Sequence, residues 1–93
     1  MVSKGQKKGT VKFILTPGNQ ANEVCVAGTF SQWKPTPLKK QKNGSFAGTV
    51  SVDGGPHEYK FVVDGQWVVD PDNSRWALNP FGTLNSVLQA DAV

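Results

Sequence analysis

Residues 57–69 read HEYKFVVDGQWVV, which is two β-prone runs separated by the dipeptide Asp64-Gly65. Asp-Gly is a preferred pair for a two-residue hairpin turn, because both central residues of that turn need a positive φ. Valine, tyrosine, phenylalanine and tryptophan on either side favour extended backbone. The segment therefore predicts a β-hairpin with strands over His57–Val63 and Gln66–Val69.

The register of this hairpin predicts which side chains share a face. Val62 lies opposite Trp67, and directly opposed residues project from the same side of a sheet. One face is apolar and is predicted to join the core: Tyr59, Phe61, Val63 and Val68. The other face mixes a tryptophan with charges: Glu58, Lys60, Val62, Trp67 and Val69. Since burying an unpaired Lys60 or Glu58 is costly, we expect this second face to be partly exposed.

Turn signals recur along the whole chain at the short spacing that is typical of a β-sandwich or small barrel. Asn43-Gly44 predicts a second two-residue hairpin. No segment has helical periodicity, so we expect an all-β fold of about seven short antiparallel strands. The expected strands are Thr10–Leu15, Glu23–Gly28, Leu38–Gln41, Ser45–Val52, His57–Val63, Gln66–Val69 and Asn85–Ala90.

The length and charge of the chain limit its organisation. At 93 residues it has room for one core, and its net charge of +3 comes from lysines in the first twelve positions. We expect residues 1–9 to form a flexible basic arm and residues 10–93 a single domain. The domain itself is near neutral, which argues against nucleic acid as a partner.

Membrane, export and redox features are few. The chain has no apolar run of about 18 residues and no secretory leader at its N-terminus, so we expect no membrane partner. Cys25 is the only cysteine and sits among small apolar residues, which predicts an inert buried thiol. A reducing, cytoplasmic location is the expectation.

The residues of the chain do not predict catalysis. His57 is the only histidine and has no accompanying nucleophile motif. Asp70 and Asp72 lie in a proline-containing turn, where aspartates cap backbone amides. No metal-ligand spacing or phosphate-binding loop is present. We therefore predict no enzyme, no cofactor and no metal.

A binding surface is the better hypothesis. A flat tryptophan covers the apolar face of a sugar ring, while neighbouring polar groups bond the hydroxyl rim. Trp67, Lys60, Thr83 and Asn85 provide such groups, and Phe81 shares a face with Thr83 and Asn85 if the segment is extended. The alternative is that the Thr83 and Asn85 side chains only form hydrogen bonds with backbone groups at the edge of a strand. Trp33, in a polar loop, could equally fold back over the core.

The segments that carry these residues resemble family-48 carbohydrate-binding modules. The resemblance rests on Val26–Trp33, Pro37-Leu38, His57–Trp67, Asp70-Pro71 and Phe81–Val87, and it spans roughly residues 10–90. Members include the glycogen-binding domain of the AMP-activated protein kinase beta subunit and domains of branching and debranching enzymes. The resemblance implies an immunoglobulin-like early-set β-sandwich that binds α-1,4-linked glucans such as glycogen, starch or maltooligosaccharides.

The resemblance also implies roles for individual residues. Trp33 and Trp67 match the stacking tryptophans, Lys60 the lysine that bonds glucose hydroxyls, and Thr83 and Asn85 the polar contacts before the last strand. Phe81 departs from the leucine that kinase beta subunits carry there. Trp76 has no assigned role, since it could pack under the Phe81 loop or extend the sugar platform.

A second departure concerns regulation. No serine stands in Lys39–Lys42, where the kinase subunits are phosphorylated, and the chain ends at Val93. We therefore expect a stand-alone glucan-binding protein or an excised module, with a glucan-processing enzyme or a kinase as a candidate partner.

Two other hypotheses make different predictions. A structural or protein-interaction early-set domain with a vestigial sugar site, acting as a spacer in such an assembly, predicts that no glucan binds. Single-stranded nucleic-acid binding through the aromatics and the basic arm predicts steep salt dependence.

Overall fold

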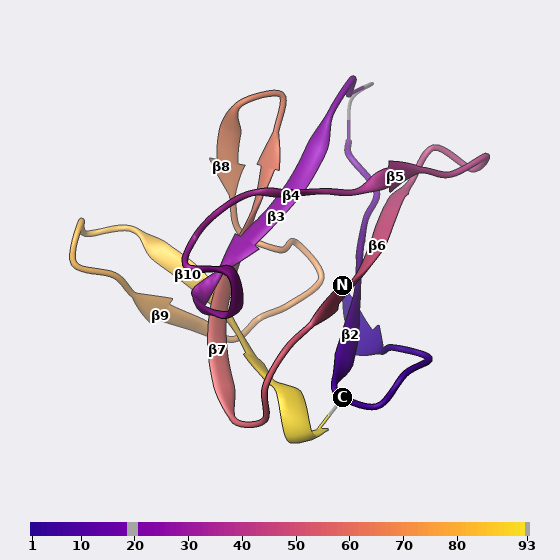
Figure 1. Ribbon diagram of the computed structural model, residues 1–93. Helices are drawn as coiled ribbons and strands as arrows, with labels where there is room; N and C mark the ends of the chain where they lie inside the picture. The colour runs from indigo at the N-terminus through magenta and orange to yellow at the C-terminus, as the bar shows by residue number, and fades with distance from the viewer. Residues whose placement is uncertain (19–20, 93) are drawn as a thin grey trace.

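The computed structural model describes residues 1–18 and 21–92 as two antiparallel sheets with two short 3-10 helices (Figure 1). The elements are β1 Val2–Lys4, β2 Thr10–Leu15, β3 Val24–Gly28, η1 Thr29–Ser31, β4 Thr36–Pro37, β5 Lys39–Lys40, β6 Phe46–Ser51, β7 Pro56–Val63, β8 Gln66–Val68, β9 Trp76–Leu78, β10 Leu84–Gln89 and η2 Ala90–Ala92. The smaller sheet has the order β1-β2-β6-β5. The larger has the order β4-β3-β7-β10-β9, and β8 pairs with β7. In these described residues, no helix is both long and apolar enough to cross a membrane.

The predicted all-β sandwich is confirmed, and two parts of the strand assignment differ from it. The segment expected as one strand, Leu38–Gln41, contains only the two-residue strand β5, and β4, which ends just before it, belongs to the other sheet. Leu38, between β4 and β5, is buried and donates its N–H to the carbonyl of Val24 at 2.8 Å. The chain therefore crosses between sheets here. Two further strands, β1 and β9, were not expected.

Residues 2–4 form an edge strand, although we expected a flexible arm over residues 1–9. Strand β1 pairs with β2 in a register that places Val2 opposite Phe13 and Lys4 opposite Val11. Val2 packs against the core. The partial burial of this valine, together with the ladder of backbone hydrogen bonds, gives the segment a defined position despite Lys4.

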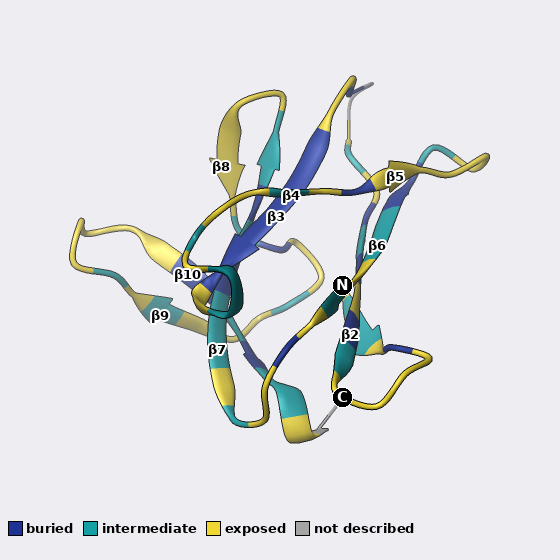
Figure 2. Cartoon of the chain, in the orientation of Figure 1, coloured by how far each residue is buried: buried dark blue, intermediate teal, exposed yellow. Residues whose placement is uncertain are grey.

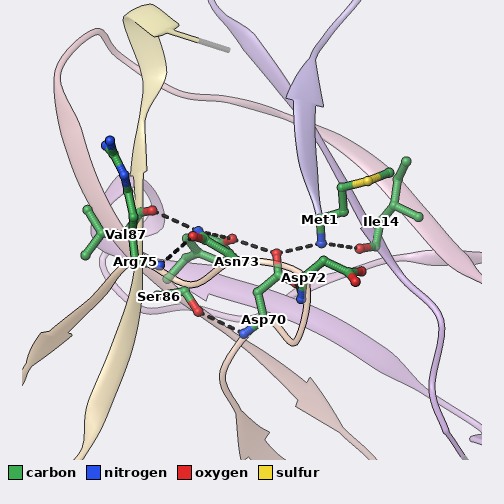
Figure 3. Close-up of polar contacts among 9 residues, drawn as sticks. Met1, Ile14, Asp70, Asp72, Asn73, Arg75, Ser86 and Val87 are labelled. Carbon is green, nitrogen blue, oxygen red and sulfur yellow. Dashed lines mark hydrogen bonds and ion pairs between the residues drawn. The ribbon is translucent and has the colours of Figure 1, made fainter.

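The buried carboxylate of Asp70 links Met1, the residue before β1, to the loop that follows β8 (Figure 3). Its Oδ2 accepts the Tyr59 hydroxyl at 2.7 Å and lies 2.6 Å from the Met1 ammonium group. Its Oδ1 accepts the Asp72 N–H at 2.9 Å, which is the backbone cap expected of this turn. Burial, above all, raises the pKa of the Tyr59 phenol far above its usual value. Tyr59 therefore stays protonated at every ordinary pH and remains the hydrogen-bond donor to Asp70.

The core lies between the two sheets and depends on alternation along the strands. Figure 2 shows β3 buried along its length, and the inward residues of β2 are buried too. The core residues are Val11, Phe13, Leu15, Ala21, Val24, Val26, Leu38, Phe46, Val52, Tyr59, Phe61 and Leu88. Val68 was expected to join them, but 37% of it is exposed. All three residues of β8 are exposed, because this short strand pairs only with the end of β7.

The Asp64-Gly65 hairpin forms in the predicted register. Val63 lies opposite Gln66 and Val62 opposite Trp67, and both turn residues have positive φ, 48° at Asp64 and 87° at Gly65. This register turns Lys60, Val62 and Trp67 to the outer face of the larger sheet.

The Asn43-Gly44 turn differs from the prediction. Only Gly44 has a positive φ, and the Gln41 N–H donates to the Ser45 carbonyl at 2.7 Å. The loop therefore has three residues, 42–44, with glycine at its left-handed position. The dipeptide correctly located the turn but not its length.

Replacing Gly65 by valine is expected to destabilise the protein by about 1–2 kcal/mol, because a β-branched residue is strained in the left-handed region. No atom lies within 4 Å of the position that a Cβ would take, so the cost comes from the backbone alone. Urea unfolding would measure it. Gln66→Val places the same side chain at the adjacent exposed, extended position and is the control. Equal midpoints for the two variants would contradict the assigned turn.

Candidate functional site

A groove of about 490 Å³ lies on the outer face of the larger sheet. Strands β7, β8 and β10 contribute to it, together with the loops that follow η1 and β9. The lining residues are Thr29, Trp33, Glu58, Lys60, Trp67, Asn79, Pro80, Phe81, Thr83 and Asn85. The structure thus brings together all six residues singled out in the sequence, which are Trp33, Lys60, Trp67, Phe81, Thr83 and Asn85.

The two tryptophans lie side by side. Their ring centroids are 6.4 Å apart and their planes are tilted by 49°. Trp67 is 48% exposed, whereas Trp33 is half-buried and is not part of the core cluster. Of the two alternatives for Trp33, the structure therefore shows the position beside the groove.

The loop that positions Trp33 is held in an unusual conformation. Gln32 and Trp33 both have left-handed φ values, 55° and 61°. The Trp33 N–H donates to the Gly28 carbonyl at 2.9 Å, and the Ser31 hydroxyl donates to the Lys34 carbonyl at 2.9 Å. These bonds offset a backbone strain of roughly 1–2 kcal/mol per residue, and strain of this kind is often found at functional sites.

A row of polar side chains runs along the floor of the groove. The Lys60 ammonium donates to the Thr83 hydroxyl oxygen at 3.2 Å, and the Asn85 amide donates to the Glu58 carboxylate at 2.9 Å. Asn79 joins the two pairs, since its amide nitrogen donates to Thr83 at 2.6 Å and to Asn85 at 3.1 Å. Thr83 and Asn85 therefore bond side chains, rather than serving only the strand-edge backbone.

The loop between β9 and β10 carries Phe81 at its tip. The Asn79 side-chain oxygen Oδ1 accepts the N–H groups of Phe81 at 3.0 Å and Thr83 at 3.1 Å, which folds the loop tightly. Phe81 is 91% exposed. It lies in this turn and not in the extended segment that we expected, because β10 begins only at Leu84.

Trp76 does not extend the groove. Strand β9 pairs with β10 so that Ala77 lies opposite Asn85 and Trp76 opposite Ser86. Because neighbouring residues of a strand face opposite sides, Trp76 lies on the face away from the groove. It is 54% exposed there.

Sequence reasoning missed four of the lining residues: Thr29, Glu58, Asn79 and Pro80. The two-residue period of a β-strand was a usable signal for Glu58, because it is two residues from Lys60 and so faces the same side of the sheet. Asn79 precedes a Pro-Phe-Gly turn, the position where an asparagine side chain commonly bonds the backbone two residues on. The role of Thr29 has no local sequence signal.

His57 and Cys25 lie outside the groove and have structural partners. His57 bonds the Thr29 hydroxyl through Nδ1 and the Asp53 carbonyl through Nε2, each at 2.9 Å. Burial, followed by the nearby Glu23 carboxylate, raises the pKa of the Cys25 thiol. Across residues 1–18 and 21–92, no three metal-ligating side chains gather into a cluster.

A β-sandwich that carries paired tryptophans beside a row of polar side chains, on the outer face of one sheet, has the features of a carbohydrate-binding module. Residues 11–92 match the family described as the glycogen recognition site of AMP-activated protein kinase. The chain belongs to this family of non-catalytic glycogen-recognition modules, and its fold is the expected immunoglobulin-like early-set sandwich.

Individual relatives agree with this assignment. The pig (Sus scrofa) 5'-AMP-activated protein kinase subunit beta-1 is 37% identical over 87 residues, which cover 94% of this chain and 67% of that protein. Protein PTST homolog 2, chloroplastic, of Arabidopsis thaliana is 44% identical over 54 residues, or 57% of this chain and 10% of that protein. The chain spans 29% of the rat and mouse beta-1 subunits.

The fold recurs in a solved structure. A maltogenic amylase from S. marinus superposes with a TM-score of 0.70 at 23% identity, covering 86% of this chain and 13% of the amylase. At this identity the likeness concerns the fold alone.

Proposed function

We propose that the groove binds an α-1,4-linked glucan, with Trp33 and Trp67 against the apolar faces of glucose rings. Lys60, Thr83 and Asn85 then bond the hydroxyl rims. The observation that carries the proposal is the gathering of these side chains, from three strands and two loops, around one groove. The tilt of 49° between the tryptophan rings suits two successive glucose units of a curved chain better than two units of a flat one.

Phe81 is proposed to extend this platform at its open end. Its ring is almost fully exposed at the tip of the loop that also carries Thr83. A glucose ring laid against it would remove apolar surface of both partners from water. An aromatic ring here offers a flat stacking surface, which a leucine does not.

The charges of the groove favour a neutral ligand. Lys60 is its one cation and Glu58 its one anion among the ten lining residues. A nucleic-acid groove would instead present a track of positive charge. The spacer hypothesis is not favoured either, because a vestigial site would have no reason to keep two tryptophans beside the groove and a polar row with donors left for a ligand.

Intrinsic tryptophan fluorescence, titrated with maltoheptaose at low and at high salt, tests the proposal. We expect a saturable change whose midpoint is the same at both salt concentrations, since the ligand carries no charge. Cellohexaose, with β-1,4 linkages, is the control and is expected to bind far more weakly. A flat titration, together with no retention on immobilised glycogen, would favour the spacer hypothesis.

The wider context of the module is a separate proposal. Its similarity to kinase beta subunits supports attachment to a kinase assembly, and the proposed glucan ligand would also suit a glucan-processing assembly. We propose that the protein acts in the cytoplasm and contributes binding and no catalysis to such an assembly.

A further inference from the structure

We infer that Glu58 is a specificity-determining residue of the groove, because its carboxylate accepts sugar hydroxyl protons and orients the polar row. The inference rests on the proposed function. It concerns a residue that the tryptophan and lysine pattern does not include. The hydrogen-bonded side chains form the row Glu58–Asn85–Asn79–Thr83–Lys60, and each link of the row has a defined donor and acceptor.

The orientation of the row begins at Glu58. A carboxylate can only accept, so the Asn85 side chain must turn its amide nitrogen toward Glu58 Oε1, at 2.9 Å. The Asn85 carbonyl oxygen then faces the other way, toward the Asn79 amide nitrogen at 3.1 Å. The carboxylate thus fixes which end of Asn85 is a donor.

The loop fixes the same orientation from its own side. Asn79 Oδ1 accepts two backbone N–H groups, from Phe81 and Thr83, so Asn79 Nδ2 must point into the row. That nitrogen has two hydrogens, and Asn85 and Thr83 accept them. Two independent constraints therefore give one arrangement, and Asn79 has no bonding capacity left for a ligand.

Thr83 is consequently a donor toward the ligand. Its hydroxyl oxygen already accepts from Asn79 and from the Lys60 ammonium, which uses both lone pairs. Its own proton remains for a sugar oxygen. Lys60 can only donate as well, and Asn85 presents its second N–H.

The row therefore offers donors at Lys60, Thr83 and Asn85, and a carboxylate acceptor only at Glu58. Glu58 Oε2 makes no polar contact with the described residues. Each glucose hydroxyl both accepts and donates, and a desolvated hydroxyl proton without an acceptor is unfavourable. A glucose hydroxyl that accepts a hydrogen bond from this row can donate its own proton to Glu58 Oε2. Both hydrogen-bonding functions of that hydroxyl are then satisfied.

Glu58→Gln tests the acceptor role with almost no change of shape. The glutamine carbonyl can keep the bond to Asn85, so the row keeps its direction, while an NH₂ group replaces Oε2. We expect the affinity for maltoheptaose, measured by calorimetry, to fall roughly tenfold, the effect of losing one charge-assisted hydrogen bond. Glu23→Gln removes the same charge at an exposed position outside the groove and is expected to bind as the unchanged protein does.

Glu58→Ala tests the positioning role. This variant also frees the Asn85 amide, so we expect a larger loss of affinity than in Glu58→Gln. The NMR resonances of the Asn85 side-chain NH₂ are expected to move in Glu58→Ala and to stay close to their original position in Glu58→Gln. A merely structural role would not separate the two variants in this way.

The outcomes are distinguishable. Failure of the unchanged protein to bind maltoheptaose would overturn the proposed function and this inference with it. Binding by the unchanged protein, and by Glu58→Gln within about twofold, would overturn the role of Glu58 alone. Equal losses in Glu58→Gln and Glu23→Gln would trace the effect to charge and would likewise overturn it.

Discussion

Replacing Trp67 by alanine is expected to reduce the affinity for maltoheptaose by about 30-fold or more while the protein stays folded. An aromatic anchor at the centre of a binding site typically contributes about 2 kcal/mol or more, which corresponds to that factor. Trp67 is half exposed on β8, a strand with no buried residue. Its removal also leaves Trp33 without its neighbouring ring, so both stacking positions are affected.

Trp76→Ala is the matched control for this prediction. It deletes the same side chain at a similarly exposed position, but on the face away from the groove. Calorimetry should show unchanged affinity, and thermal melting should show a cooperative transition in both variants. Loss of cooperative unfolding in Trp67→Ala would instead assign Trp67 to the core. Equal losses of affinity in both variants would disprove the location of the site.

The face that carries the groove was predictable because it depends on local turn chemistry. Asp64-Gly65 allows one kind of turn, that turn fixes the register, and the register fixes the side on which Lys60 and Trp67 lie. The polar loop of Trp33 and the alternation of Phe81, Thr83 and Asn85 were visible in the sequence, but only the resemblance to known modules connected these residues to the hairpin. Lys60 and Trp67 are the two residues that both the hairpin register and the resemblance assign to this face.

The elements that escaped prediction are short and depend on distant partners. Strand β1 has three residues and two of them are polar or charged, so only its pairing with β2 makes it a strand. The chain crosses between the sheets at Leu38, and no residue pattern marks that point. Val68 lies opposite the core residue Phe61 and so faces the same side of the sheet, yet it is exposed because the opposing sheet does not cover it.

The orientation of polar groups is a further property that sequence does not encode. Glu58 was placed on the correct face by parity, but its bond to Asn85 depends on how β7 and β10 come together. Asn79 is in hydrogen-bond contact with both Thr83 and Asn85 only because the loop folds tightly over its side chain. Such a row can be described only once the strands are in place.

Replacing Phe13 by alanine is expected to have the largest effect on stability, a loss of about 3–5 kcal/mol. The ring is fully buried on β2, with centroids 5.3 Å from Phe30, 5.3 Å from Tyr59 and 6.5 Å from Phe61. Small domains have a total stability of about 5–15 kcal/mol, so a substantial unfolded fraction is expected. Urea unfolding measures the loss.

The core residues around Phe13 adjoin groove residues along the chain. Tyr59 and Phe61 alternate with Lys60 along β7, and Phe30 lies in η1, directly before the loop that holds Trp33. Phe13→Ala should therefore lower apparent glucan affinity only by reducing the folded fraction of the protein, and excess maltoheptaose should raise the melting temperature of this variant.

Phe81→Ala is the control for stability. It deletes the same ring at a position where 91% of it is exposed, and it should change stability by less than about 0.5 kcal/mol. Equal unfolding midpoints for Phe13→Ala and Phe81→Ala would contradict a core built around Phe13.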